Sequence, residues 1–414
     1  MPEQGKPETI HLVVLELHHH GELLKNLYDT LKLNNFKLTL VTIPKVYKDS
    51  GLPSAGSDPR LDIQLKKPEE YIADFLQRMA PVFASADIIY FNTVAGYWKE
   101  VNRIRFTAPA IIRIHNAHCD LSPLRHFRNP VLNSPAILSH LLRKVLIGRE
   151  WNLRKSLFEK IDYVMFPNET ITHYVKDHNW VDPQKILDPV LPFGYLGEKE
   201  LRKIPDINQR DTINIAITGK VTNCKKDFTL VYRALRKYLQ DPNSPRVKLT
   251  LLGNAGHKQV GNIIRNFESL TSDRFHLDYS TDYVPAEEFE KKVASVDFFV
   301  APIKIDTHFK KYREVYGKSK MSGVENDILR YRKPSLIPSN YIIESPLDKA
   351  IEYFPPDPES LANSIKSWAI NQTYREIALA FNQMKKYNRN DIADNFYDLC
   401  KKMKHQKQAN KESS

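Results

Sequence analysis

The chain has 414 residues, of which 42% are apolar and 27% are charged. At about 150 residues per domain, this length predicts two or three domains of ordinary globular composition. A fully disordered chain, a collagen-like repeat and a disulfide scaffold are excluded. The formal net charge of +12 favours anionic partners: nucleic acid, an anionic membrane surface or phosphorylated ligands.

The cysteines and the hydropathy pattern bear on the compartment. Cys119, Cys224 and Cys400 stand far apart without a CxxC pair, which argues against structural zinc and suits a reducing compartment. No uninterrupted apolar run reaches the roughly 18 residues needed to span a membrane. The N-terminus lacks the basic region and cleavage site of a signal peptide. We therefore expect a cytoplasmic protein.

The first half of the chain alternates short apolar runs with segments of helical periodicity. Strands are predicted at 10–17, 36–43, 86–91, 110–114 and 163–166. Helices are predicted at 22–33, 69–83, 134–159 and 169–177, the last capped by Asn168, and 44–68 is predicted to be a loop. This βαβ rhythm indicates a parallel sheet with helices on both faces.

A polar, aperiodic segment at 201–211 indicates a linker, after which the rhythm restarts. Strands are predicted at 213–217, 247–252, 275–277, 296–301 and 335–337, and helices at 228–238, 261–269, 285–294, 323–331, 360–371, 374–384 and 396–403. Residues 401–414 hold five lysines against one glutamate and are predicted to form a solvated basic tail, with membrane binding as the alternative. The fold class is α/β, with two sheets facing a cleft, and ligands bind beyond the carboxyl ends of such strands.

Basic residues follow the first strand of the second half. Gly219 and Lys220 come directly after the strand, and Lys225 and Lys226 precede the next helix. Lysines at a helix N-terminus neutralise a diphosphate together with backbone N–H groups, although each of them could also be a solvated surface lysine. Gly253 occupies the corresponding turn after the next strand.

A second basic segment, YGKSKMSGVEND, spans 316–327 and joins a hydroxyl-rich loop to a helix start. Its loop residues are suited to phosphate oxygens, and they include Ser319, Lys320, Ser322 and Gly323. Glu325 or Asp327 could accept hydrogen bonds from sugar or ribose hydroxyls, or could simply complement the helix dipole. No GxxxxGK[ST] sequence occurs, which excludes a Walker A loop.

Histidines follow two strands of the first half. In IHNAHCD, His115 and His118 are spaced as HxxH without the glutamate of a zincin, so hydrogen bonding to a hydroxyl or phosphate is preferred over metal binding, with a structural role as the alternative. The segment HHHGE ends in His20, Gly21 and Glu22, which are candidates for acceptor contact. Consecutive histidines rarely converge on one ion, so a metal site there is disfavoured.

The order of these segments resembles the family-4 type of nucleotide-sugar glycosyltransferases with the GT-B fold. In the second half the resemblance is carried by ITGKVTNCKKDFTLVYRAL, VKLTLLGNAG, DYVPAEEFEKKVASVDFFVAPI and GVENDILRYRKPSLIPS. In the first half it is carried by IIRIHNAHCDLSP, YVMFPNETITHYV and KILDPVLPFGYL. Together these segments cover most of residues 8–390.

The resemblance implies two Rossmann-like, doubly wound domains. They would be an acceptor-side domain over 1–205, a nucleotide-sugar donor domain over 206–385, and a helix that crosses back to the first domain with a basic tail over 386–414. It implies transfer of a sugar from a nucleoside diphosphate sugar to an acceptor hydroxyl, with lysines stabilising the leaving diphosphate. The lysines in this role would be Lys220, Lys225 or Lys226, and Lys320. The loop with His115 and His118 would close over the sugar. No metal or other cofactor is expected.

The sequence departs from the family pattern in two places. The family's Gly-Arg is Gly219-Lys220 here, which keeps the charge and loses bidentate geometry. The family's pair of glutamates is not intact, because alignment on Lys333-Pro334 puts Asp327 at the second glutamate and Ser319 at the first. The acidic-pair mechanism and the choice between retention and inversion therefore stay open.

We expect a metal-independent hexosyltransferase in surface polysaccharide or glycolipid assembly, with a glycan or lipid-linked acceptor. The basic charge suits docking at the inner face of an anionic membrane. A nucleotide-sugar epimerase of the same fold and a non-catalytic partner subunit are the alternatives. A nucleic-acid partner is not expected, because the chain has no aromatic-interleaved basic repeat and no RRM, KH or zinc motif.

Overall fold

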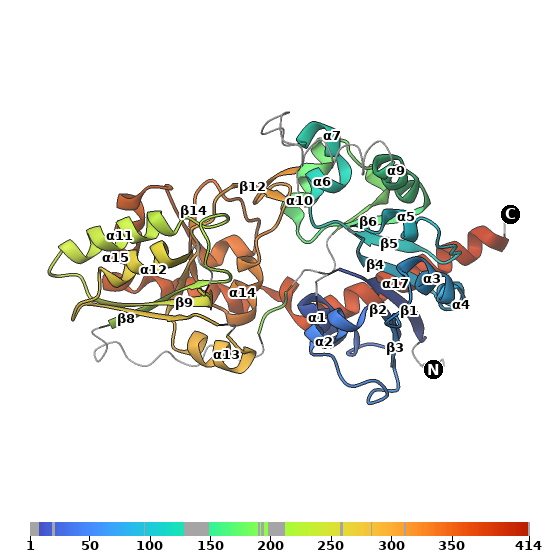
Figure 1. Cartoon of the computed structure of the whole chain (residues 1–414), viewed down its shortest axis with the longest axis horizontal. Helices are drawn as coiled ribbons and strands as arrows, with labels where there is room; N and C mark the ends of the chain where they lie inside the picture. The colour runs from blue at the N-terminus through green and yellow to red at the C-terminus, as the bar shows by residue number, and fades with distance from the viewer. Residues whose placement is uncertain are drawn as a thin grey trace, which may run out of the picture. The chain divides into compact units, whose positions relative to one another are not determined.

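The computed structural model describes residues 8–18, 21–94, 96–127, 149–188, 191, 194–197, 212–256, 260–282, 284–309 and 312–412 (Figure 1). They group into two compact units. Unit 1 holds the described residues of 1–193, 309–313 and 389–414, and unit 2 those of 194–308 and 314–388.

Unit 1 is built on a seven-stranded parallel sheet in the order β3-β2-β1-β4-β5-β6-β7, counted over the described residues. The strands are β1 (Ile10–Glu16), β2 (Phe36–Thr42), β3 (Leu61–Leu65), β4 (Ile88–Thr93), β5 (Ala110–Arg113), β6 (Tyr163–Met165) and β7 (Ile186–Leu187). The order runs one way from β1 to β3 and the other way from β4 to β7, so the switch point lies between β1 and β4.

Most helices of unit 1 lie between its strands in the sequence, and the last, α17, returns to this unit after unit 2. They are α1 (Gly21–Leu31), α2 (Pro44–Ser50), α3 (Ile72–Arg78), α4 (Ala80–Ala84), α5 (Trp98–Val101), α6 (Ala117–Leu121), α7 (Pro123–His126), α9 (Glu150–Lys160), α10 (Glu169–Asp177) and α17 (Arg389–Glu412). A central strand such as β1 is largely apolar and has buried side chains on both sides, which is typical of a parallel sheet covered on both faces. The predicted cap of α10 is confirmed, because Asn168 Oδ1 accepts from Ile171 N at 3.1 Å.

Unit 2 repeats the design with a six-stranded parallel sheet in the order β10-β9-β8-β11-β14-β15, again over the described residues, and a separate two-stranded sheet, β12-β13, is divided between the two units. The strands are β8 (Thr212–Thr218), β9 (Arg246–Asn254), β10 (Phe275–Ser280), β11 (Phe298–Val300), β14 (Ser335–Pro338) and β15 (Ile351–Phe354), with β12 (Asp306–Phe309) and β13 (Tyr312–Val315) in the hairpin. The helices are α11 (Phe228–Gln240), α12 (Gly261–Glu268), α13 (Ala286–Ala294), α14 (Val324–Tyr331), α15 (Pro358–Asn371) and α16 (Thr373–Ala378).

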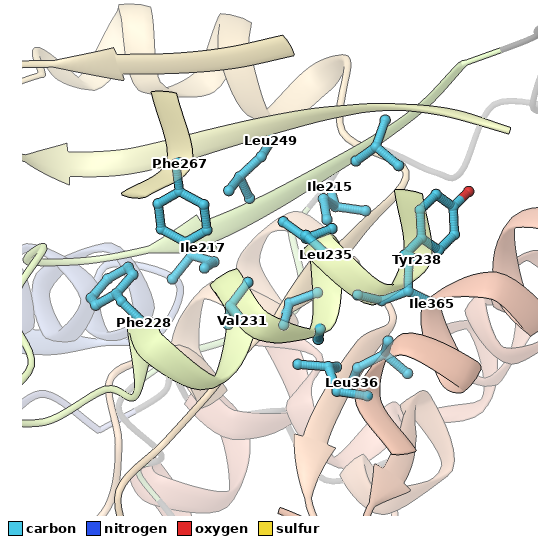
Figure 2. Close-up of a cluster of buried hydrophobic side chains, with 14 of the residues drawn as sticks. Ile215, Ile217, Phe228, Val231, Leu235, Tyr238, Leu249, Phe267, Leu336 and Ile365 are labelled. Atoms are coloured by element: carbon cyan, nitrogen blue, oxygen red, sulfur yellow. The ribbon is translucent and has the colours of Figure 1, made fainter. Parts of the chain in front are cut away.

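Alternation along β8 supplies a core on each face of this sheet. Ile215 and Ile217 pack with Phe228 and Leu235 of α11 (Figure 2). Ala216 points the other way, into the cluster that includes residues of α13 and α14. The switch point of unit 2 lies between β8 and β11, which hydrogen-bond as parallel neighbours.

Several sequence predictions need correction. The predicted loop over 44–68 contains α2 and the edge strand β3, whose short sequence LDIQL is too polar to stand out as a buried strand. The helix expected at 69–83 is two short helices, and the hairpin and β15 were not predicted. The linker at 201–211 and the helical segment at 134–148 lie outside the described residues.

The tail predicted over 401–414 is helical to Glu412, where it continues α17; most of its described side chains are exposed, but some are not. Met403 is buried, and Lys404 Nζ lies 2.8 Å from Glu8 and 3.0 Å from Asp87. Lys407 Nζ lies 2.9 Å from Asp162. These lysines are therefore paired with carboxylates of unit 1. None of the helices in the described ranges combines the length and apolar content needed to cross a bilayer.

We predict that Phe396→Ala destabilises unit 1 by about 3–5 kcal/mol, because the side chain is fully buried and leaves a cavity. Its ring centroid lies 5.9 Å from that of Phe36 and 6.3 Å from that of Tyr90. Urea unfolding measures the loss. Exposed Lys401 on the same helix is the control, and Lys401→Ala should change stability by less than about 0.5 kcal/mol. Equal stability of the two variants would contradict the packing of α17.

Candidate functional site

The turn after β8 touches the turn after β9. Gly219 has φ +78°, in the left-handed region that favours glycine, and its N–H donates to the carbonyl of Leu252 at 2.8 Å. A Cβ added to Gly253 would lie 2.3 Å from the carbonyl oxygen of Gly219. Glycine at 253 is therefore required by the approach of the two backbones, whatever else binds there.

The loop from Lys220 to Asp227 is held against the segment that follows β11. Asp227 N donates to the carbonyl of Pro302 at 2.7 Å, and Lys304 N donates to the carbonyl of Lys225 at 3.0 Å. Lys304 Nζ adds a bond to the carbonyl of Asn223 at 2.8 Å. Asp227 also caps α11 by accepting from Leu230 N at 2.9 Å. The loop is thus fixed at the switch point of unit 2, where α/β sheets bind ligands.

Three lysines were predicted for this loop, and the structure distinguishes them. Lys220 and Lys225 are exposed, whereas Lys226 is half-buried and its Nζ donates to the carbonyl oxygen of Thr218. A Cβ on Gly219 would lie 3.1 Å from that Nζ, so the ammonium group stands directly over the turn. Burial, opposed by the charge of Asp327 and reinforced by Lys225, lowers the pKa of Lys226 to about 8.

The loop over 316–323 is a tight turn with an internal polar network. Gly317 has φ +74° and its N–H donates to the carbonyl of Lys320 at 2.9 Å. Ser319 is fully buried; its hydroxyl donates to the Glu314 carboxylate at 2.6 Å and accepts from Val315 N at 2.8 Å. The Ser319 hydroxyl therefore stabilises the loop, and Lys320 stands half-buried beside it.

The start of α14 is fixed by a buried tyrosine. Tyr341 accepts from Ser322 N at 2.9 Å and donates to the Glu325 carboxylate. Burial, and then the charge of Glu325, raise the pKa of Tyr341 well above its usual value. Glu325 is itself 3% exposed. Among the predicted acids Asp327 is half-buried, and Gly323 has open space where a Cβ would be, so packing does not require that glycine.

In unit 1, His115 follows β5 and contacts the end of β4. Its Nε2 lies 2.7 Å from the carbonyl oxygen of Asn92 and 3.1 Å from Thr93 Oγ1. A carbonyl oxygen only accepts, so this nitrogen carries a proton. The ring is half-buried at the carboxyl edge of the sheet.

His118 lies in an aromatic cluster instead. Its Nδ1 donates to the carbonyl of Arg313 at 2.9 Å, so its Nε2 accepts from the Tyr174 hydroxyl at 2.9 Å. The ring stacks on His126 with centroids 3.5 Å apart, and Trp180 packs edge-on. Burial, and then the neighbouring His126, lower the pKa of His118 to about 4. Both ring nitrogens serve protein partners, and contact of His118 with a substrate would require them to be exchanged.

The predicted acceptor-side residues have different environments. A Cβ on Gly21 would lie 2.9 Å from the backbone of Asp49 and Ser50, so this glycine allows α1 to pack closely on α2. Glu22 is exposed in the first turn of α1. His20 lies outside the described residues. The functional roles assigned to all these residues stay predictions.

Sequence reasoning missed a buried carboxyl at the end of β1. Glu16 is fully buried; it accepts from His18 N at 2.7 Å and from Asn92 Nδ2 at 2.6 Å. Burial, opposed by these hydrogen bonds and one from Thr93, raises the pKa of Glu16 to about 7. The signal in the sequence was a single acid ending an otherwise apolar strand. Among the described residues no group of three or more His, Cys, Asp or Glu side chains could hold a metal ion.

No protein-family model and no curated protein matches the sequence. Solved structures do match. A glycosyltransferase from Rickettsia africae has 10% identity and a TM-score of 0.61 over 96% of this chain and 99% of that chain. A structure described as trehalose-6-phosphate from E. coli bound with UDP-2-fluoro glucose has 11% identity and a TM-score of 0.58 over 94% of this chain and 99% of that chain. The N-terminal domain of Candida albicans trehalose-6-phosphate phosphatase has 11% identity and a TM-score of 0.60 over 96% of this chain and 100% of that chain.

At such identities the likeness establishes the fold. The predicted fold class, α/β with two Rossmann-like domains of the GT-B type, is confirmed by the two parallel sheets and by these whole-chain matches. The likeness to GT-B glycosyltransferases that the sequence showed is confirmed with it.

We predict that Gly253→Ala displaces the turn after β8 and destabilises unit 2 by about 1–3 kcal/mol, because its Cβ would overlap the Gly219 carbonyl. Gly261→Ala is the matched control, since a Cβ there meets nothing within 4 Å and alanine suits the first turn of α12. Thermal unfolding of both variants measures the difference. An undisturbed Gly253→Ala variant would contradict the close approach of the two turns.

We predict that stability falls as the pH is lowered from 6.5 towards 4, in part through His118. Its pKa in the folded protein, about 4, lies below the ordinary 6.5, so protonation favours the unfolded chain and the stabilisation is complete only above about pH 6.5. Urea midpoints across this range measure the slope. In His118→Phe the slope should be shallower although overall stability drops, whereas exposed His173→Gln should keep the wild-type slope. Equal slopes in all three proteins would contradict the assignment.

Proposed function

We propose that the protein is a glycosyltransferase that moves a sugar from a nucleoside diphosphate sugar to an acceptor hydroxyl. The observation that carries this proposal is the half-buried ammonium group of Lys226, held over the Gly219 turn at the carboxyl end of β8. A cation and a glycine turn at the switch point of an α/β sheet are suited to a phosphate group.

The chemistry that such a site supplies is stabilisation of the leaving group. Negative charge grows on the diphosphate as the bond to the sugar breaks, and preorganised cations lower the free energy of that transition state. Lys226 would exchange the carbonyl oxygen of Thr218 for a phosphate oxygen. An anion at that position would favour the charged form of Lys226 and raise its pKa from about 8. Exposed Lys220 and Lys225 and half-buried Lys320 would add charge around it.

The remaining donor contacts would come from the edges of unit 2. The peptide N–H of Lys220 and those at the start of α14 are suited to phosphate oxygens, with Gly253, Ser319, Ser322 and Gly323 shaping the turns. Asp327 would be available to donor hydroxyls, whereas Glu325 is engaged by Tyr341. Charge supplied by lysines makes a metal-independent hexosyltransferase our preferred form of the proposal. The matched E. coli structure was solved with UDP-2-fluoro glucose, which favours the same donor class.

On the acceptor side, His115 is the histidine whose position at a strand end suits hydrogen bonding to a sugar or acceptor hydroxyl. Glu22, with Gly21 and His20, would lie at the neighbouring β1–α1 turn. The net charge of +12 favours a glycan or lipid-linked acceptor carrying phosphate, in surface polysaccharide or glycolipid assembly. A peripheral position at the inner face of a membrane would depend on exposed lysines such as Lys401 and Lys402, since Lys404 and Lys407 are paired.

We predict that one of UDP, GDP, TDP, ADP and CMP raises the melting temperature with EDTA present, and that Lys226→Met weakens this ligand about 10- to 100-fold by removing a charged hydrogen-bond donor. Lys291→Met, on the exposed face of α13, is the charge-matched control and should bind as the wild type does.

Wild-type affinity in Lys226→Met would reject the phosphate site. Binding that appears only with Mg²⁺ or Mn²⁺ would reject metal independence, and no binding in either condition would favour a non-catalytic partner subunit. Conversion of a nucleotide sugar without any acceptor would favour an epimerase over a transferase.

A further inference from the structure

A second polar cluster lies at the switch point of unit 1, at the carboxyl ends of β1 and β4. The two strands pair in regular register from Leu12 with Ile88 to Leu15 with Phe91, and the next pair is Glu16 with Thr93. Asn92 is therefore an extra residue in β4. Such a bulge redirects side chains, and here it brings Asn92 and Thr93 together against Glu16.

The Glu16 carboxyl group is held from three sides. Its Oε1 accepts from His18 N at 2.7 Å, and its Oε2 accepts from Asn92 Nδ2 at 2.6 Å. The Thr93 side chain lies beside the carboxyl group and favours its ionised form. A fully buried carboxyl with a main-chain and a side-chain donor is more than strand packing requires, because an apolar side chain would fill the same position without desolvating a charge.

The same residues hold His115. Its Nε2–H points to the Asn92 carbonyl at 2.7 Å and to Thr93 Oγ1 at 3.1 Å. Asn92 therefore contacts both groups, since its carbonyl oxygen accepts from the imidazole and its side-chain amide donates to Glu16. The Thr93 hydroxyl accepts from the imidazole and lies beside the Glu16 carboxyl group, so that all four residues meet at adjoining strand ends of unit 1.

We propose that Glu16 is a positioning residue for His115. Acting through Thr93 and Asn92, it fixes the ring in the tautomer protonated at Nε2 and, when ionised, stabilises the imidazolium form. This inference rests on the proposed function, in which His115 contacts the sugar or the acceptor hydroxyl. A carboxylate that orients a histidine through its other nitrogen, and favours its charged form, is a general way of tuning an acid–base group.

Few titratable groups interact with the Glu16 carboxyl group. Tyr90 on β4 feels its charge, together with the charges of Arg113 on β5 and Cys400 on α17. Arg113 lies over the Tyr90 ring at 5.8 Å and donates to the carbonyl of Leu191. The hydroxyl of Thr42 on β2 donates to the Glu16 carbonyl at 2.6 Å. Burial raises the pKa of Glu16 to about 7, so this carboxyl group changes charge within the pH range of the NMR test described next.

The test is histidine NMR on the full-length chain, labelled with ¹³C and ¹⁵N at histidine, with the His115 signals assigned by their loss in His115→Gln. We expect His115 of the wild type to hold its proton at Nε2 when neutral and to titrate in two steps. In Glu16→Gln we expect one step, with the His115 pKa lowered by about one unit through loss of the opposite charge. Thr93→Val should produce the same change without altering the carboxyl group.

The control is Glu69→Gln, which removes an exposed carboxylate from unit 1 and should leave the His115 titration unchanged. Identical titrations in Glu16→Gln, Thr93→Val and Glu69→Gln would overturn the proposal, as would a neutral His115 protonated at Nδ1 in the wild type. If Glu16→Gln does not fold, Thr93→Val decides alone. The readout needs no substrate, so failure of nucleotide binding, which rejects the proposed function, remains distinguishable from failure of this inference.

Discussion

The arrangement depends on one topological constraint, the reversal of strand order in each parallel sheet. On either side of the reversal the connections leave in opposite directions, so backbone and polar groups at the carboxyl ends are not covered by a crossover. In unit 2 the reversal lies between β8 and β11, where the Gly219 turn and Lys226 are found. In unit 1 it lies between β1 and β4, where Glu16 and Thr93 are found. The two clusters occupy equivalent positions in two separately built sheets.

Burial shifts the pKa of one group in each cluster, and the two shifts have opposite directions. It disfavours the charged form of each group, so it lowers the pKa of Lys226 to about 8 and raises that of Glu16 to about 7. The charge of Asp327 opposes the shift of Lys226, and hydrogen bonds from His18, Thr93 and Asn92 oppose the shift of Glu16. The same desolvation strengthens any contact these groups make with a ligand, because electrostatic interactions are stronger at low dielectric. Perturbed groups of this kind gather at functional sites.

Much of the fold could be predicted because the local spacing of apolar residues indicates each element. Buried strands such as Ile10–Glu16 and amphipathic helices such as Phe228–Gln240 can be recognised within a dozen residues. The edge strand Leu61–Leu65 does not, because one side is not covered by another strand and its sequence stays polar. The helical continuation to Glu412 was hidden because its lysines pair with carboxylates distant in sequence.

The site was less predictable, because its geometry comes from long-range contacts. Nothing in KKD distinguishes Lys226 from Lys225; the contact of this loop with Pro302 and Lys304 does. In the sequence, Glu16 is simply the last residue of a strand. Its position beside Thr93 follows from a shift in strand register that the sequence does not reveal. Conversely, Ser319 and His118 looked available in the sequence, and the structure gives their polar atoms partners inside the protein.

The central claim is that the cation over the Gly219 turn binds a diphosphate. The most direct test is a crystal structure of the full-length protein with the nucleoside diphosphate that stabilises it most. We expect phosphate oxygens within hydrogen-bond distance of Lys226 Nζ and of the Lys220 peptide N–H, with the ammonium group released from the Thr218 carbonyl. A diphosphate bound elsewhere, with Lys226 still on that carbonyl, would contradict this claim.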